Sequence, residues 1–179
     1  MSKLPFRILW CIGMVGAGFT IPQLAASARQ HRAKPCIDSK PIAQRVALTL
    51  TADKKKIVNN QVTYQLIAGK ASVKPGDIIR YTVIAKNNSR CPLRNLVLKQ
   101  PIPRGTNYVK DSATASDGAQ LLFSIDGGRT FAAKPTLGKE DAPATAYNYL
   151  RWKFAGRMKP NSQVKTTYEL QVKSNVDRK

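Results

Sequence analysis

The sequence predicts an all-β protein, a sandwich of antiparallel strands that follows an N-terminal signal peptide. Short runs of alternating apolar and polar residues recur along the 179 residues, and each is bounded by Gly, Pro, Asn or Asp. We find no convincing amphipathic helix. Hydrophobic residues make up 42% of the chain, which excludes a wholly disordered basic polypeptide and predicts a packed core.

The first 28 residues are typical of a signal peptide. Basic residues precede an uncharged, mostly apolar run at 8–21, which is shorter than the roughly 20 residues that a membrane-spanning helix needs. Small side chains at Ala26 and Ala28 suit a signal peptidase, so we expect cleavage after Ala28. The alternative is an uncleaved anchor over 8–28. The remaining divisions are a basic extended lead-in (29–45), the sandwich (46–173) and a C-terminal tail (174–179).

Cleavage and export would change both the net charge of the mature chain and the expected state of its cysteines. The whole chain carries 30 basic and 10 acidic residues, a formal net charge of +20; cleavage removes two basic residues and leaves +18 on 151 residues. Cys36 and Cys91 remain, and an oxidising compartment favours a disulfide between them. Two separate thiols stay open as the alternative, because the sequence does not give the distance between their Cα atoms.

The first half of the mature chain gives three strands. The lead-in has prolines and no helical or alternating period, so we expect it to be extended. Alternation then predicts strands at 46–51 and 62–66, separated by a polar stretch at 54–56. The clearest strand follows the turn at 75–77, with an inward face made of Ile79, Tyr81, Val83 and Ala85.

The second half continues the pattern. Leu96 and Leu98 are expected to begin a strand that Pro101 and Pro103 end or push to a sheet edge, and 108–109 to form a short strand. A hairpin with its turn at 126–129 joins 121–125 to 130–132. Residues 134–148 read as a long loop. Runs at 150–154 and 164–172 are expected to pair antiparallel with each other, and Trp152, Tyr81 and Tyr168 fall on the inward positions, where we expect core packing.

Several short motifs occur in an order that resembles a known family. They are Val73–Asp77, Tyr81–Val83, Asn87–Asn88, Pro101–Pro103 with Gly105, Thr106 and Tyr108, Phe123–Gly128, Leu150–Trp152 and Met158–Pro160. The succession resembles the conserved-repeat module of bacterial surface proteins called domain of unknown function eleven, over about residues 46–173. The resemblance implies an immunoglobulin-like sandwich in an exported protein, from a family with no established enzymatic activity. Gln100 and Asn161 depart from the Asp and Gly usual in that family, and the single copy argues against a long stalk.

Catalytic residues are scarce. The chain has one histidine, His31, which precedes the predicted fold, and its acids do not follow the spacing of a calcium loop. Ser162 and Lys165 are spaced like the serine and lysine of penicillin-recognising enzymes, but that pair needs a helix, whereas residues three apart in a strand face opposite ways. We expect neither enzymatic activity nor a cofactor or metal; a serine hydrolase or transpeptidase-like enzyme is the remote alternative.

Basic side chains on the outward positions of the later strands suggest a binding surface. If these strands share a sheet, they form one positive face that attracts polyanions, although a generic solvated surface is an equal alternative. The candidates are Arg80, Lys86, Arg151, Lys153, Lys165 and Lys173.

The predicted function is therefore an exported, non-catalytic module of the bacterial envelope, in the periplasm or at the cell surface, or alternatively anchored by its N-terminus. Expected partners are lipopolysaccharide, anionic lipid or acidic polysaccharide, or another envelope protein. Nucleic acid other than extracellular DNA is not expected, because no exposed aromatics alternate with the basic residues. The alternative function is a secretion or assembly accessory protein that pairs through a strand edge.

Overall fold

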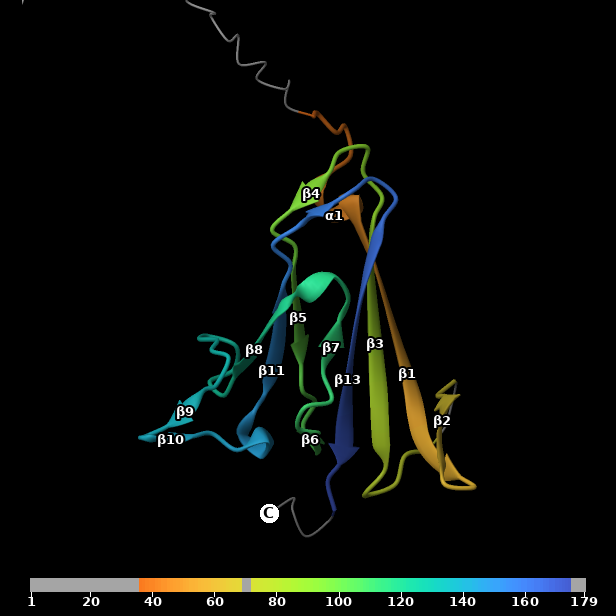
Figure 1. Ribbon diagram of the computed structural model, residues 1–179, viewed down its shortest axis with the longest axis vertical. Helices are drawn as coiled ribbons and strands as arrows, with labels where there is room; N and C mark the ends of the chain where they lie inside the picture. The colour runs from red at the N-terminus through yellow and green to blue at the C-terminus, as the bar shows by residue number, and fades with distance from the viewer. Residues whose placement is uncertain (1–35, 69–71, 175–179) are drawn as a thin grey trace, which may run out of the picture. The chain divides into compact units, whose positions relative to one another are not determined.

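The computed structural model describes residues 36–174, with the exception of 69–71. The predicted signal peptide, with Ala26 and Ala28, and His31 lie outside the described residues. Within the described part, antiparallel strands form the two main layers of an all-β sandwich, as the sequence predicts (Figure 1). No helix in the described part is long and apolar enough to cross a membrane.

The larger layer is a six-stranded sheet in the order β2-β1-β3-β13-β6, with β7 also paired to β13. Its strands are β1 (Val46–Val58), β2 (Gln61–Leu66), β3 (Ile78–Asn87), β6 (Thr106–Tyr108), β7 (Thr114–Ala115) and β13 (Gln163–Val172). Alternation in β3 and β13 places one face of each strand against the core and the other outward, as expected of an antiparallel sheet in a sandwich.

The smaller layer is a three-stranded sheet in the order β5-β11-β8. Its strands are β5 (Val97–Pro101), β8 (Gln120–Ser124) and β11 (Tyr149–Lys153). Two short ladders and three helical turns complete the described elements: β4 (Leu93–Arg94) with β12 (Arg157–Met158), β9 (Thr136–Leu137) with β10 (Glu140–Asp141), α1 (Ile42–Arg45), η1 (Ser116–Gly118) and η2 (Ala144–Ala146).

The core lies between the two sheets and is built around Trp152. This side chain, on β11, is fully buried, and its ring packs against Tyr168 of β13 with 5.7 Å between the ring centroids. Tyr168 in turn stacks on Tyr81 of β3 at 5.3 Å. The prediction that these three aromatic residues pack in the core is confirmed, and the inward face predicted for β3 is confirmed by the burial of Val83 and Ala85.

Two predictions about strand arrangement are wrong. The runs at 150–154 and 164–172 do not pair: β11 lies between β5 and β8, whereas β13 lies between β3 and β6. Both strands bury one face in the same core, so their alternation is the same whether they pair or lie in facing sheets. The polar stretch at 54–56 belongs to β1, because β2 pairs with it from Asp53 to Val58.

The hairpin prediction is half right. β8 precedes the turn, but residues 130–132 form no strand and contribute one bridge, between Phe123 and Ala132. Gly127 and Gly128 in the turn have φ values of 75° and 80°, in the left-handed region where glycine has no steric penalty. The long loop predicted at 134–148 contains the short β9–β10 ladder and η2.

The described part of the lead-in is fixed to the fold. The predicted disulfide between Cys36 and Cys91 is present, with 5.6 Å between the Cα atoms. The Asp38 carboxylate accepts a hydrogen bond from the Arg90 backbone N–H at 2.6 Å, and Lys40 Nζ donates to the Asn88 carbonyl at 2.6 Å. The expectation of a wholly extended lead-in is wrong for α1, a single helical turn just before β1.

Candidate functional site

The six basic residues predicted to form one face lie on two opposite faces of the sandwich. This division follows from the pairing described above, because β11 belongs to the small sheet. The outer surface of the large sheet, here the large-sheet face, carries Arg80 and Lys86 on β3 and Lys165 on β13, with Lys173 just after that strand. Arg151 and Lys153 lie on the outer surface of the small sheet. The prediction of a single positive face is therefore wrong.

On the large-sheet face, Arg80 is neutralised by an acid. Its guanidinium is 3.0 Å from the Asp53 carboxylate of β1, the residue directly opposite in the ladder. The Tyr64 ring of β2 also covers the guanidinium, with 3.5 Å between the Arg80 Cζ atom and the ring centroid. Arg80 is thus occupied in tying β1, β2 and β3 together.

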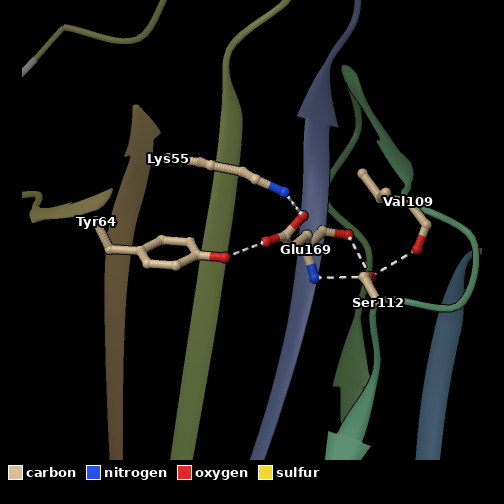
Figure 2. A network of polar contacts seen from close by, with 5 residues as sticks. All are labelled: Lys55, Tyr64, Val109, Ser112 and Glu169. Atoms are coloured by element: carbon tan, nitrogen blue, oxygen red, sulfur yellow. Dashed lines mark hydrogen bonds and ion pairs between the residues drawn. The ribbon is translucent and has the colours of Figure 1, made fainter. Parts of the chain in front are cut away.

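A second group of polar contacts on this face centres on Glu169 of β13 (Figure 2). One carboxylate oxygen accepts from Lys55 Nζ at 2.9 Å and the other from the Tyr64 hydroxyl at 2.8 Å. The Glu169 backbone N–H donates to Ser112 Oγ at 3.0 Å, and that hydroxyl donates to the Val109 carbonyl at 2.6 Å. These contacts join β2 and β1 to β13 across β3.

The contacts around Glu169 stabilise the fold, because Lys55 and Tyr64 both donate to its carboxylate. The hydrogen bond to Glu169 raises the pKa of the Lys55 ammonium, while burial and then the same carboxylate raise the pKa of the Tyr64 phenol. Each shift favours the protonated donor. The carboxylate is therefore engaged on both oxygens by groups that hold their protons.

The other basic residues of the large-sheet face have different surroundings. Lys86 and Lys165 are exposed, and Lys165 lies opposite Ile84 in the β3–β13 ladder. Lys173 is half-buried, and its backbone N–H donates to the Gly105 carbonyl at 2.8 Å.

The outer surface of the small sheet combines cations with aromatic rings. The Arg151 guanidinium lies 3.5 Å from the centroid of the Phe131 ring. Lys99 of β5, directly opposite Arg151 in the ladder, places Nζ 4.6 Å from the Tyr149 centroid and 5.5 Å from that of Phe131. These four residues together with Lys153 are called the small-sheet face below.

The cations of the small-sheet face have no acidic partner in the described part of the chain. The three ion pairs there join Lys54 to Asp77, Lys55 to Glu169 and Arg80 to Asp53. An aromatic ring attracts a cation through its quadrupole but carries no net charge, so Lys99 and Arg151 keep their full positive charge. Arg151 Nε is buried and has no hydrogen-bond partner, whereas Lys99 Nζ donates to the Gly128 carbonyl at 3.2 Å.

Asp126, in the hairpin turn beside Gly128, is committed to its own loop. Its carboxylate accepts hydrogen bonds from the Thr130 hydroxyl at 2.6 Å, from the Thr130 and Arg129 backbone N–H groups and from the Ser124 hydroxyl. These bonds, with those from Thr130 the strongest, hold the pKa of the Asp126 carboxyl well below its usual range. Asp126 therefore stabilises the turn that the sequence predicts at 126–129.

No family model, curated protein or solved structure matches the chain. The likeness of residues 46–173 to the conserved-repeat module accordingly stays a prediction, as does every role it implies. The small-sheet face must be judged on its own chemistry.

Sequence reasoning missed three members of this face. Lys99 occupies an outward position of a predicted strand, and Tyr149 occupies the outward position next to Arg151, so both carried a usable signal. Phe131 carried none, because it follows the hairpin turn and only the folded chain brings its ring to Arg151. Phe131 and Tyr149 are half-buried, so the expectation that no exposed aromatic residues alternate with the basic residues stays a prediction.

The residues considered for catalysis show other contacts. Ser162 Oγ donates to the Lys159 carbonyl at 2.7 Å, and the Lys165 backbone N–H donates to Ser116 Oγ at 2.9 Å. Ser162 borders a hollow of about 320 Å³ whose apolar lining includes Phe154 and Met158. No cluster of three or more His, Cys, Asp or Glu side chains suited to a metal ion occurs among the described residues.

Proposed function

We propose that the protein is a non-catalytic β-sandwich module of the bacterial cell envelope that binds anionic envelope polymers through the small-sheet face. The observation that carries the proposal is the position of Lys99 and Arg151 over the Phe131 and Tyr149 rings, without the acidic partners that neutralise Arg80 and Lys55. A cation that lies over a ring and has no acidic partner in the protein can attract an anion from a ligand.

The two kinds of cation give the face complementary properties. The planar guanidinium of Arg151 donates in pairs to phosphate or carboxylate oxygens, and its stacking on Phe131 reduces the conformational entropy lost on binding. Lys99 and Lys153 add point charges along the neighbouring strands. The ligand class is a polymer or surface bearing repeated phosphates or carboxylates, such as lipopolysaccharide, anionic lipid or acidic polysaccharide.

Two further observations support an envelope location for this binding. The Cys36–Cys91 disulfide is compatible with an oxidising, exported compartment, and the first 28 residues have the pattern of a signal peptide. The place of action is then the periplasm or the cell surface, and the chain acts there as an immunoglobulin-like module. Binding of this kind weakens as salt screens the charges.

A pair of charge-reversal variants tests the proposal. The first carries Lys99→Glu, Arg151→Glu and Lys153→Glu; the second carries Lys86→Glu, Lys165→Glu and Lys173→Glu and changes the net charge equally. We expect the first to bind heparin and lipopolysaccharide at least about tenfold more weakly at 0.15 M salt, because local charge governs docking. The second should lose much less.

Elution from immobilised heparin and binding to lipopolysaccharide give the readouts, and circular dichroism confirms that both variants fold. Equal losses in the two variants would show that net charge alone governs retention, which overturns the small-sheet face as a site. Unchanged binding of the first variant overturns polyanion binding through this face altogether.

A further inference from the structure

The N-terminal half of β1 is an open sheet edge. Residues 46–54 pair with β3 on one side, but β2 occupies the other side only from Asp53 onward (Figure 1). Ile67 lies beside Ala52 on that side as well, so in the described part of the chain residues 46–51, here called the free segment, have one unpaired edge. A strand with an unpaired edge is a template for pairing with another strand.

The backbone of the free segment is oriented for such pairing. The Ala52 carbonyl accepts a hydrogen bond from the Ile67 N–H at 2.8 Å, so Ala52 directs its backbone groups toward the side on which β2 lies. In an antiparallel sheet, alternate residues direct both N–H and C=O to the same side. Leu48 and Leu50 consequently present their N–H and C=O groups at the open edge.

The side chains at this edge are apolar and lie in water. Leu48 and Leu50 are opposite Ala85 and Val83 in the ladder and share their inward face, yet they are 61% and 56% exposed, whereas Ala85 and Val83 are 0% and 1% exposed. The three-stranded small sheet covers β3 and leaves this part of β1 uncovered. The core surface thus continues past the small sheet as an exposed apolar strip.

We infer that this edge is an interface with a second copy of the same chain, formed by antiparallel pairing of the two free segments about a two-fold axis at Thr49. In this register Leu48 of each copy lies opposite Leu50 of the other, and Ala47 lies opposite Thr51. The pairing directs the open backbone groups of Leu48 and Leu50 at each other and places four leucines together on the inward side.

A second copy fits better than an unrelated strand because the segment is complementary to itself. The sequence Val-Ala-Leu-Thr-Leu-Thr contains no charged residue, although the chain carries a formal net charge of +20, so pairing sets no like charges opposite each other. The register about Thr49 pairs residues 47–51 and so ends before Ala52, whose carbonyl already accepts a hydrogen bond from Ile67. A single isologous contact of this kind closes as a dimer.

The interface is small, so we expect a dimer with a dissociation constant on the order of 10 μM. Because both copies are strongly basic, dimerisation should strengthen with salt, which screens their repulsion. Polyanion binding by the small-sheet face changes with salt in the opposite direction, so the two surfaces can be tested independently.

Cysteine cross-linking tests the register. At the two-fold axis the two Thr49 residues form a non-hydrogen-bonded pair with Cα atoms about 4.5 Å apart, within disulfide range. Thr49→Cys should give a disulfide-linked dimer on mild oxidation, seen on a non-reducing gel. Ala47→Cys is the matched control: it faces outward like Thr49 but lies opposite Thr51 of the second copy, so it should form no disulfide-linked dimer.

Substitution of the leucines tests the affinity. Leu48→Lys with Leu50→Lys should weaken dimerisation at least about tenfold in sedimentation equilibrium, because each change acts twice in a symmetric interface. Both side chains are exposed, so the fold should persist. A protein that stays monomeric at 0.5 M salt and about 1 mM concentration overturns the inference. Equal cross-linking of Thr49→Cys and Ala47→Cys overturns it too, as does a dimer that the lysines do not weaken.

Discussion

The two outer faces of the sandwich use basic residues in opposite ways. On the large-sheet face, Arg80 and Lys55 meet the carboxylates of Asp53 and Glu169. On the small-sheet face, Arg151 and Lys99 meet aromatic rings. Every one of these cations occupies a strand, and alternation alone does not distinguish them. The side chain that each cation contacts, a carboxylate or an aromatic ring, decides whether it stabilises the fold or remains available to a ligand.

The contrast has an energetic basis. A half-buried ion pair depends on both members, because removing one leaves the other desolvated without a partner. A cation over a ring makes a weaker contact and retains a charge that is not compensated. We therefore expect changes on the large-sheet face to affect stability and changes on the small-sheet face to affect binding.

The largest effect on stability should come from Glu169→Ala. Lys55 and Tyr64 both lose their acceptor, so the free energy of unfolding should fall by about 2 kcal/mol. Urea unfolding followed by circular dichroism measures this, and retention on heparin should not decrease. Arg151→Ala is the comparison variant and should cost less than about 1 kcal/mol. If its cost equals that of Glu169→Ala, the faces do not differ as proposed.

The second largest effect should be a loss of stability at alkaline pH, through the contacts of the large-sheet face. The pKa values of Lys55 and Tyr64 are raised in the folded protein, so their contribution to stability is complete below about pH 10 and is lost as the pH rises through the folded values. Burial also raises the pKa of Tyr108 and Tyr168, in the same direction. Between pH 8 and pH 11, the midpoint of urea unfolding should therefore fall less in Tyr64→Phe than in the parent protein. An identical fall would contradict a contribution from Tyr64.

The smallest effect should be a difference in heparin binding between alanine variants of two glycines in the same turn. Gly128→Ala places a Cβ atom 2.6 Å from Lys99 Nζ, whereas a Cβ atom at Gly127 meets nothing within 4 Å. Both substitutions force alanine into the left-handed region at a cost of about 1 kcal/mol. Only Gly128→Ala should also lower the salt concentration of heparin elution, because it displaces Lys99. Equal elution of the two variants would show that the position of Lys99 is unimportant.

Much of the fold follows from alternation because each sheet has one buried face. The inward positions of β3 and β13 could be read from the sequence, since each strand is long enough to show the two-residue period. The partner of β11 could not, because a strand that pairs with β13 and one that packs against it from the facing sheet have the same pattern. Ladders of two residues, such as β4 with β12, are too short to show any period.

The candidate site was less predictable than the fold. Arg151 and Lys153 were identified by their outward position, but their separation from Arg80 and Lys165 depends on which sheet contains β11. The disulfide was predictable from the count and location of the cysteines. Phe131 acquires its role only through the path of the loop after the hairpin turn, which no local pattern encodes.

The position of β13 has a consequence for how the chain is made. This last strand pairs with β3 on one side and with β6 and β7 on the other, so the middle of the large sheet is supplied by the final part of the described chain. A growing polypeptide that lacks residues 163–172 leaves those earlier strands without their common neighbour. The large sheet therefore cannot be completed before residues 163–172 have been made, and such contacts between distant parts of the sequence slow folding.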